Sequence, residues 1–113
     1  MAKYEKTVRS NLSFIDYVEE VTNSVLSKSM SATMEEFVDT TVGNAQCSVR
    51  TVERYSASGG NRVSMTMVFL KDGESDDIQV IATSTGGGGG LFKIIPWGEN
   101  EFLQTLITTL EEI

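Results

Sequence analysis

Three arginines are the residues whose type and spacing are best suited to bind a ligand. Arg50 and Arg54 are four positions apart in an alternating segment, and Arg62 follows the next turn. In a strand, Arg50 and Arg54 share one face, because alternate side chains point the same way. Guanidinium groups bind carboxylates and phosphates through paired hydrogen bonds. We therefore expect a basic strip on the open face of a sheet, where it holds an anion. The alternative is an ordinary solvated sheet face with cross-strand ion pairs.

Five consecutive glycines, Gly86 to Gly90, are the second candidate site. Glycine-rich turns can direct several backbone N–H groups at an anion, so Gly86, Gly87 and Gly88 could form a ligand lid. The run lacks the Gly-Lys-Ser/Thr ending of a phosphate loop. A flexible connector between two elements is the alternative interpretation.

Met65, Met67 and Trp97 are candidates for contact with an apolar ligand. Methionine adapts its shape, which suits a variable ligand and an irregular protein core equally well. Both interpretations stay open at this point.

The residue types for most catalytic mechanisms are missing from the sequence. The chain has no His and one Cys, so Ser-His, Cys-His and zinc sites are excluded. Acid-base chemistry would have to come from carboxylates or tyrosines such as Glu35, Glu53 and Tyr55, and nothing in the sequence shows one of them buried. We expect no catalytic residues, no metal and no cofactor, with a carboxylate- or Tyr-based enzyme as the less favoured alternative.

Charge and hydropathy restrict the partners and the location. The 9 basic and 16 acidic side chains give a net charge of -7, which disfavours nucleic acid and anionic membranes. The sequence shows no secretory signal, no run long enough for a membrane span, and only Cys47 as a thiol. We expect a cytoplasmic protein, with 1–113 forming a single domain.

Hydrophobic periodicity predicts seven elements. An alternating strand occupies 2–9, and a helix begins after the cap residue Ser13 and covers about 14–28. From residue 31 the period is two: Met34, Val38 and Val42 share one face of the first strand, and a turn follows at Gly43 and Asn44. Three further strands then bury one side, and a final helix covers about 99–112. The buried positions are expected to be Cys47 and Val49, then Val63, Met65, Met67 and Phe69, then Ile78, Val80 and Ala82.

The predicted order is β-α-β-β-β-β-α. Short reversals between the four central strands indicate an antiparallel meander, and both helices need the same apolar face. We therefore predict an α+β fold, a two-layer sandwich with an antiparallel sheet and two helices on one face.

Two resemblances accompany this order. The topology resembles the TATA-box-binding-protein-like class, whose helix-grip members hold apolar ligands between sheet and final helix. The segments VERYS at 52–56, GNRVS at 60–64, STGG at 84–87, LFKI at 91–94 and WGE at 97–99 are similar to a family of small uncharacterised Gram-positive bacterial proteins of unknown function. Neither resemblance implies a functional residue.

These observations together predict a non-enzymatic binding domain. Its ligand would be a small apolar or anionic molecule. The alternative is a protein-protein interaction module that acts as a homo-oligomer, and a homodimer could form through a sheet edge or face.

Overall fold

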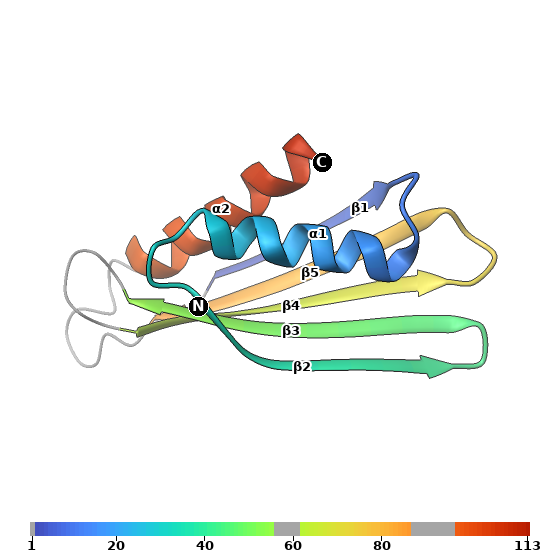
Figure 1. The fold of residues 1–113 in the computed structure, drawn as a ribbon, viewed down its shortest axis with the longest axis horizontal. Coiled ribbons are helices and arrows are strands. Elements are labelled where there is room, and N and C mark those ends of the chain that lie inside the picture. The colour runs from blue at the N-terminus through green and yellow to red at the C-terminus, as the bar shows by residue number, and fades with distance from the viewer. Residues whose placement is uncertain (1, 56–61, 87–96) are drawn as a thin grey trace.

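The protein is a five-stranded antiparallel sheet with two helices packed on one side (Figure 1). The computed structural model describes residues 2–55, 62–86 and 97–113. The elements are β1 (Ala2–Arg9), α1 (Phe14–Ser27), β2 (Thr33–Val42), β3 (Ala45–Tyr55), β4 (Arg62–Asp72), β5 (Asp77–Gly86) and α2 (Trp97–Glu112). The strand order is β1-β5-β4-β3-β2, so β1 and β2 form the two edges. The predicted α+β fold class and meander are confirmed.

Helix α1 begins where the sequence predicts. The Ser13 hydroxyl accepts a hydrogen bond from the Asp16 backbone N–H at 3.2 Å, which satisfies one of the otherwise unpaired donors of the first turn. One stripe of the helix is buried against the sheet and α2. It consists of Phe14, Tyr17, Val18, Val21, Thr22 and Val25. This amphipathic stripe holds the helix in place, since isolated helices of this length are marginal in water.

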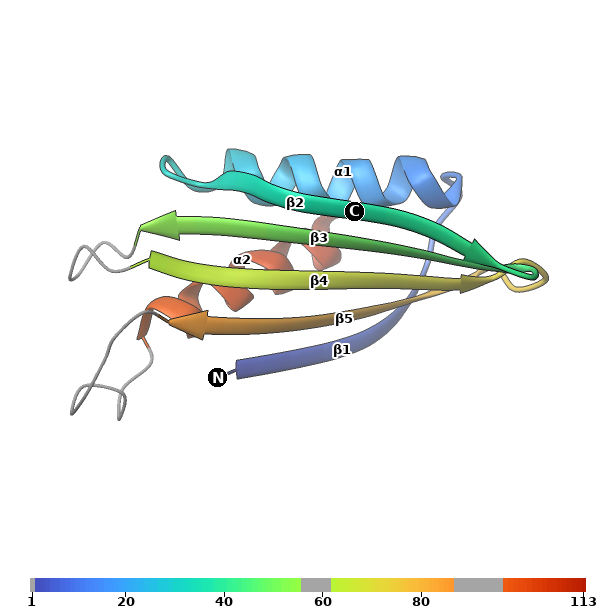
Figure 2. The ribbon, with the colours of Figure 1, turned by 90° about the horizontal axis from the view of Figure 1, so that it is seen from below.

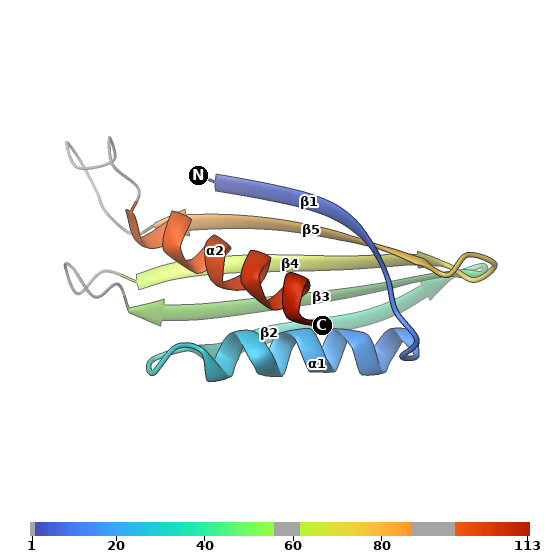
Figure 3. The same cartoon turned by 90° about the horizontal axis from the view of Figure 1, so that it is seen from above.

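Both helices lie over the same face of the sheet (Figure 3). The sheet residues beneath them are fully buried, and the predicted inward faces of β4 and β5 are confirmed. They are Val63, Met65, Met67 and Phe69 on β4, and Ile78, Val80 and Ala82 on β5. Each fully buried side chain of this size contributes roughly 1.5–3 kcal/mol relative to exposure, so this layer is the main source of stability. We call the opposite side of the sheet the open face.

Helix α2 begins at Trp97, two residues before the predicted start. Trp97 and Gly98 are therefore part of the helix. The buried stripe of α2 consists of Phe102, Leu103, Leu106, Thr109 and Leu110. The helix crosses β5 and β4 obliquely and contacts α1 (Figure 3).

The prediction for β3 placed the wrong face inward. Ser48, Arg50 and Val52 are buried beneath the helices, whereas Cys47 and Val49 lie on the open face. The cause is the pairing with β4, which sets Arg50 opposite Met67 and Ser48 opposite Phe69. Directly paired residues of antiparallel strands share a side, so the buried face of β4 determines that of β3.

The prediction for β2 was also wrong in part. A bulge between Met34 and Glu36 shifts the register, so Met34 lies opposite Val52 on the helix side. Val38 lies opposite Val49 on the open face. An extra residue in one strand reverses the side on which later side chains lie, which separates Met34 from Val38 and Val42.

Candidate functional site

Arg50 is buried under α1 and is held by carboxylates from two other elements. Its side chain is 2% exposed. Nη1 lies 2.9 Å from Asp39 Oδ1 on β2, and Nη2 lies 3.2 Å from Glu19 Oε1 on α1. The guanidinium also lies over the Phe37 ring, 5.4 Å from its centroid. Arg50 therefore ties α1, β2 and β3 together, because a buried cation needs hydrogen-bonded anions around it.

Asp39 is held in its charged form by the same cluster. The Ser48 hydroxyl donates to Asp39 Oδ1 at 2.6 Å, and this hydrogen bond, followed by that from Arg50, lowers the pKa of the Asp39 carboxyl below its usual value. Donors to the charged form favour that form. A carboxylate kept ionised in this way is unsuited to act as a general acid near neutral pH.

Arg54 lies on the same side of the sheet as Arg50, under α2. Its guanidinium carbon lies 4.8 Å from the centroid of the Phe102 ring, and Nη2 lies 3.6 Å from Glu101 Oε2. Arg62 lies on the open face, where it pairs with Glu53 and stacks over Tyr55 at 5.9 Å. The expected basic strip on the open face is therefore wrong in its placement, because the reversed phase of β3 turns Arg50 and Arg54 inward. An anion-binding role for these arginines stays a prediction.

The other predicted ligand contacts are divided between the core and the segments outside the described residues. Met65 and Met67 are both fully buried in the layer between sheet and helices. Gly86 is the last residue of β5, opposite Val63. Gly87 and Gly88 lie outside the described residues, and Trp97 is placed only as the first residue of α2.

The carboxylates considered for catalysis are engaged by neighbouring side chains, and Arg62 contacts both Glu53 and Tyr55. Glu35 accepts a hydrogen bond from Thr33, and Glu53 is bound by Arg62 and Ser64. Tyr55 is 57% exposed at the end of β3. Within residues 2–55, 62–86 and 97–113, no group of His, Cys, Asp and Glu side chains has the arrangement of a metal site. Neither of the helices described, α1 and α2, has the length and hydropathy of a membrane-spanning helix.

The open face carries an ordered set of uncharged side chains that the sequence analysis missed. Figure 2 looks onto this face, with α2 behind the strands. On the three central strands, nine side chains form three rows across the sheet. The rows are Thr83, Thr66 and Thr51, then Ile81, Val68 and Val49, then Gln79, Leu70 and Cys47. We call these nine residues the central patch. Val38 on β2 extends its middle row.

Charged side chains surround the central patch, and most of them are already paired. Arg62 binds Glu53 at one end of the sheet, and Arg9 binds Asp77 at the other end with Nε 3.0 Å from Oδ1. Glu5 on β1 accepts a hydrogen bond from Gln79. Three charges remain: Asp72 lies at the turn end of β4, and Lys3 on β1 and Glu36 on β2 are exposed at opposite edges of the threonine row. The open face therefore has an uncharged centre and a charged rim, as many protein interfaces have.

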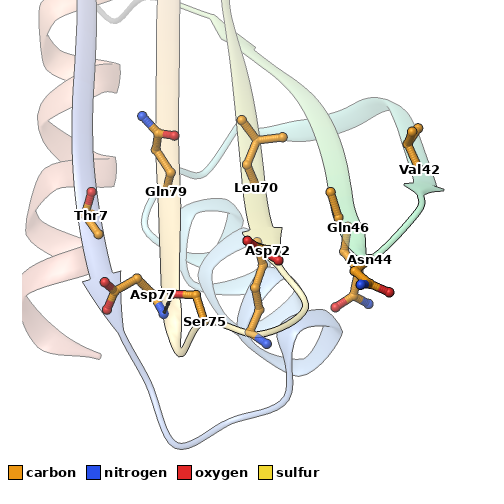
Figure 4. A pocket seen from close by; sticks show the side chains of 11 residues that line it. Thr7, Val42, Asn44, Gln46, Leu70, Asp72, Ser75, Asp77 and Gln79 are labelled. Carbon is orange, nitrogen blue, oxygen red and sulfur yellow. Dashed lines mark hydrogen bonds between the residues drawn. The ribbon is translucent and has the colours of Figure 1, made fainter.

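Two hollows among the described residues are relevant to ligand binding, one beside the central patch and one on the helix side. The larger, about 520 Å³, lies at the turn end of the sheet (Figure 4). Gln79 and Leu70 of the central patch line it together with Asn44, Asp72 and Asp77. The second, about 360 Å³, lies between the start of α1 and the β2–β3 hairpin, beside Asp39. Neither lies under α2, where a helix-grip ligand would bind.

The alternation of β4 is the signal that could have revealed the central patch. Its apolar side is unambiguous in the sequence, since Val63, Met65, Met67 and Phe69 alternate with smaller or polar residues. Pairing β3 against β4 places Arg50 inward and Val49 outward. Reading β3 alone gives the opposite answer, because Cys47 and Val49 are more apolar than Ser48 and Arg50.

Comparisons with known proteins add a family and no activity. Residues 1–113 match a family of unknown function (DUF6054). No curated protein has a sequence that matches the chain.

Proposed function

Because the chain belongs to the DUF6054 family, whose function is unknown, we propose a function on geometric grounds alone: a non-enzymatic protein-interaction domain that binds through the open face of its sheet. The observation that carries this proposal is the central patch. All nine of its side chains are uncharged, in a chain where 22% of residues are charged. Depletion of charge at the centre of a surface is typical of interface cores.

The packing of the helix layer favours this surface over a ligand cavity. Met65, Met67, Phe102 and Leu106 are all fully buried and belong to one apolar cluster between the sheet and the helices. A small apolar ligand there would have to displace close-packed side chains, which costs free energy. The hollow at the turn end is lined by the carboxylates of Asp72 and Asp77, which repel an anionic ligand.

The state of the titratable groups argues against acid-base catalysis. Asp39 is kept ionised by Ser48 and Arg50, and Glu53 is engaged by Arg62 and Ser64. An efficient general acid or base has a pKa near the working pH, and the lowered pKa of the Asp39 carboxyl lies further from it.

Site-specific photo-crosslinking in the native host tests the proposal. A photoreactive amino acid replaces Val49 in the central patch, and in a matched control it replaces the exposed Glu20 on α1. The expected result is a protein adduct of defined mass from position 49 and none from position 20. Equal adducts at both positions, or none at position 49, would contradict an interaction through the open face.

A further inference from the structure

We infer that the open face binds a second copy of this chain, sheet against sheet, around a two-fold axis that runs along β4. This inference rests on the proposed function and specifies the partner. An axis lying in the contact plane makes the same patch meet itself, which is the requirement for an isologous dimer. Because β4 is the middle strand of five, this axis brings β1 of one copy over β2 of the other.

Charge complementarity supports this arrangement. The threonine row is continuous from Lys3 on β1 through Thr83, Thr66 and Thr51 to Glu36 on β2. A two-fold axis along β4 exchanges the ends of the row, so Lys3 of each copy meets Glu36 of the other. Neither residue takes part in an ion pair elsewhere in the described part of the chain. The dimer therefore gains two opposite-charge contacts by symmetry.

The uncharged residues are also self-complementary about this axis. Thr66, Val68 and Leu70 lie on β4 and each meets its own equivalent in the second copy. Arg62 and Asp72, at the two ends of the same face of β4, also approach their equivalents, and these like-charge contacts oppose part of the gain from Lys3 and Glu36. Val49 on β3 and Ile81 on β5 flank Val68 in one row, so the axis places Val49 opposite Ile81 of the second copy. The apolar middle row thus packs on an apolar middle row. Aligned sheets pack in this manner with their mean strand directions within about 30° of each other, so the axis follows the mean direction of the two β4 strands.

The alternative axis, perpendicular to the strands, is disfavoured by charge. It would place β1 over β1 and β2 over β2 of the second copy, so Lys3 on β1 and Glu36 on β2 would stay at opposite edges and could not meet. The two opposite-charge contacts would then be lost. The sign of the edge charges therefore selects the axis along β4.

The size of the face is sufficient for a stable dimer. Neighbouring strands are about 4.8 Å apart, and side chains on one face of a strand repeat about every 6.8 Å. Five strands that each contribute four such side chains therefore cover a plane of roughly 650 Å². Side-chain relief increases the accessible area toward the roughly 800 Å² per partner that specific interfaces bury.

The first test measures the mass of the purified protein in solution. Sedimentation equilibrium at micromolar concentration is expected to give twice the chain mass. Val68→Asp places two carboxylates together on the axis and is expected to give the monomer mass. Ile15→Asp, a substitution of another partly exposed apolar residue on the helix side, is the matched control and should leave the dimer intact. Circular dichroism verifies that both variants are folded.

The second test determines the orientation. Each of the single variants Lys3→Glu and Glu36→Lys creates two like-charge contacts in the dimer. Each is expected to raise the dimer dissociation constant about tenfold. The double variant exchanges the charges and is expected to return the dissociation constant to the wild-type value. A dimer that dissociates with Val68→Asp but is unchanged by both single charge reversals would overturn the axis along β4.

The outcomes separate this inference from the proposed function. A chain that stays monomeric at high micromolar concentration, or a dimer that persists in Val68→Asp, overturns the second-copy partner. If photo-crosslinking at position 49 then yields an adduct with another protein, the open face is still an interaction surface and only its occupant differs. Absence of that adduct as well contradicts both.

Discussion

Arg50 Nη1 lies 2.9 Å from Asp39 Oδ1 across the β2–β3 pair, beneath α1. The guanidinium is almost completely buried, whereas the Asp39 side chain is 43% exposed. The pair is therefore asymmetric: the cation depends on its partners, and the carboxylate can still be hydrated. Because Glu19 on α1 binds the same guanidinium, the cluster connects an edge strand that is exposed along its whole length to the helix layer.

Removal of Asp39 should destabilise the protein only while Arg50 is present. Asp39→Ala withdraws charged hydrogen bonds from a buried guanidinium, and we expect a loss of about 1–3 kcal/mol in the free energy of unfolding. In an Arg50→Met background, where an apolar side chain fills the site, the same change should cost less than about 0.5 kcal/mol. Urea unfolding of the four proteins measures the coupling, with Asp76→Ala on an exposed turn as control. Equal costs in both backgrounds would show that the pair is not coupled.

The lowered pKa of Asp39 predicts a specific loss of stability in acid. A carboxyl whose folded pKa lies below its unfolded value contributes stability above the unfolded value, and the contribution disappears as pH falls through the folded pKa. The usual value is 3.8, and Ser48 and Arg50 lower it in the folded protein. The difference in unfolding free energy between wild type and Asp39→Asn should be constant above about pH 5 and shrink below about pH 4. A constant difference down to about pH 2.5 would contradict this.

Tyr17 should produce the opposite trend in alkali. Its ring packs edge-on against Phe69 at 6.4 Å, and burial raises the pKa of its hydroxyl above 10.0. The stabilising contribution of the neutral hydroxyl is complete below the unfolded pKa and is lost as pH rises through the folded one. Wild type should therefore lose more stability between about pH 8 and 10.5 than Tyr17→Phe. Parallel urea titrations at these pH values measure the difference, and equal losses would refute it.

Most of the fold could be predicted from local patterns. The N-cap at Ser13 and the apolar alternation of β4 are strong local signals: α1 begins where expected, and the predicted side of β4 is buried. Two stripes of helical period and one apolar sheet side were enough to infer the two-layer arrangement. The antiparallel meander followed from the short connections between strands.

The orientation of β3 could not be predicted from the strand alone, because it depends on tertiary pairing. Arg50 is more polar than Val49, yet Arg50 faces the core, where Asp39 and Glu19 compensate its charge. Those partners come from β2 and α1, and no spacing rule in the sequence connects the three residues. The same inversion hid the central patch, since Val49 was assigned to the core. The bulge in β2 could not be predicted from the sequence of that strand either, because a bulge is defined by the pairing of β2 with β3.

Gly73 should be intolerant of a side chain because of its tertiary contact. A Cβ at this position would lie 2.7 Å from the backbone oxygen of Asn44, in the adjacent turn between β2 and β3. Gly73→Ala must separate the two turns, and we expect a loss of about 1–3 kcal/mol in unfolding free energy. Gly43 is a useful comparison, because its φ of +58° is a region that Asn tolerates well and its surroundings are open. Thermal unfolding of Gly73→Ala and Gly43→Asn should therefore show the larger loss for the alanine variant. The reverse order would contradict the close approach of the two turns.

Lys28 connects the ends of the two helices and explains the acidic end of α2. Its Nζ lies 3.0 Å from Glu112 Oε2 and 3.1 Å from Thr109 Oγ1. A carboxylate is unfavourable at the C-terminal end of a helix because the helix dipole is negative there, and the Lys28 ammonium group compensates the charge of Glu112. Lys28→Met should reduce the free energy of opening of the last turn of α2 by about 0.5–1 kcal/mol, which is the usual contribution of a partly exposed ion pair. Amide hydrogen exchange at residues 109–113 measures the change, with the exposed Lys6→Met as matched control. Faster exchange in the last turn with Lys28→Met alone is the expected result, and equal protection in both variants would show that the two helix ends are held by apolar packing of Leu106 and Leu110 instead.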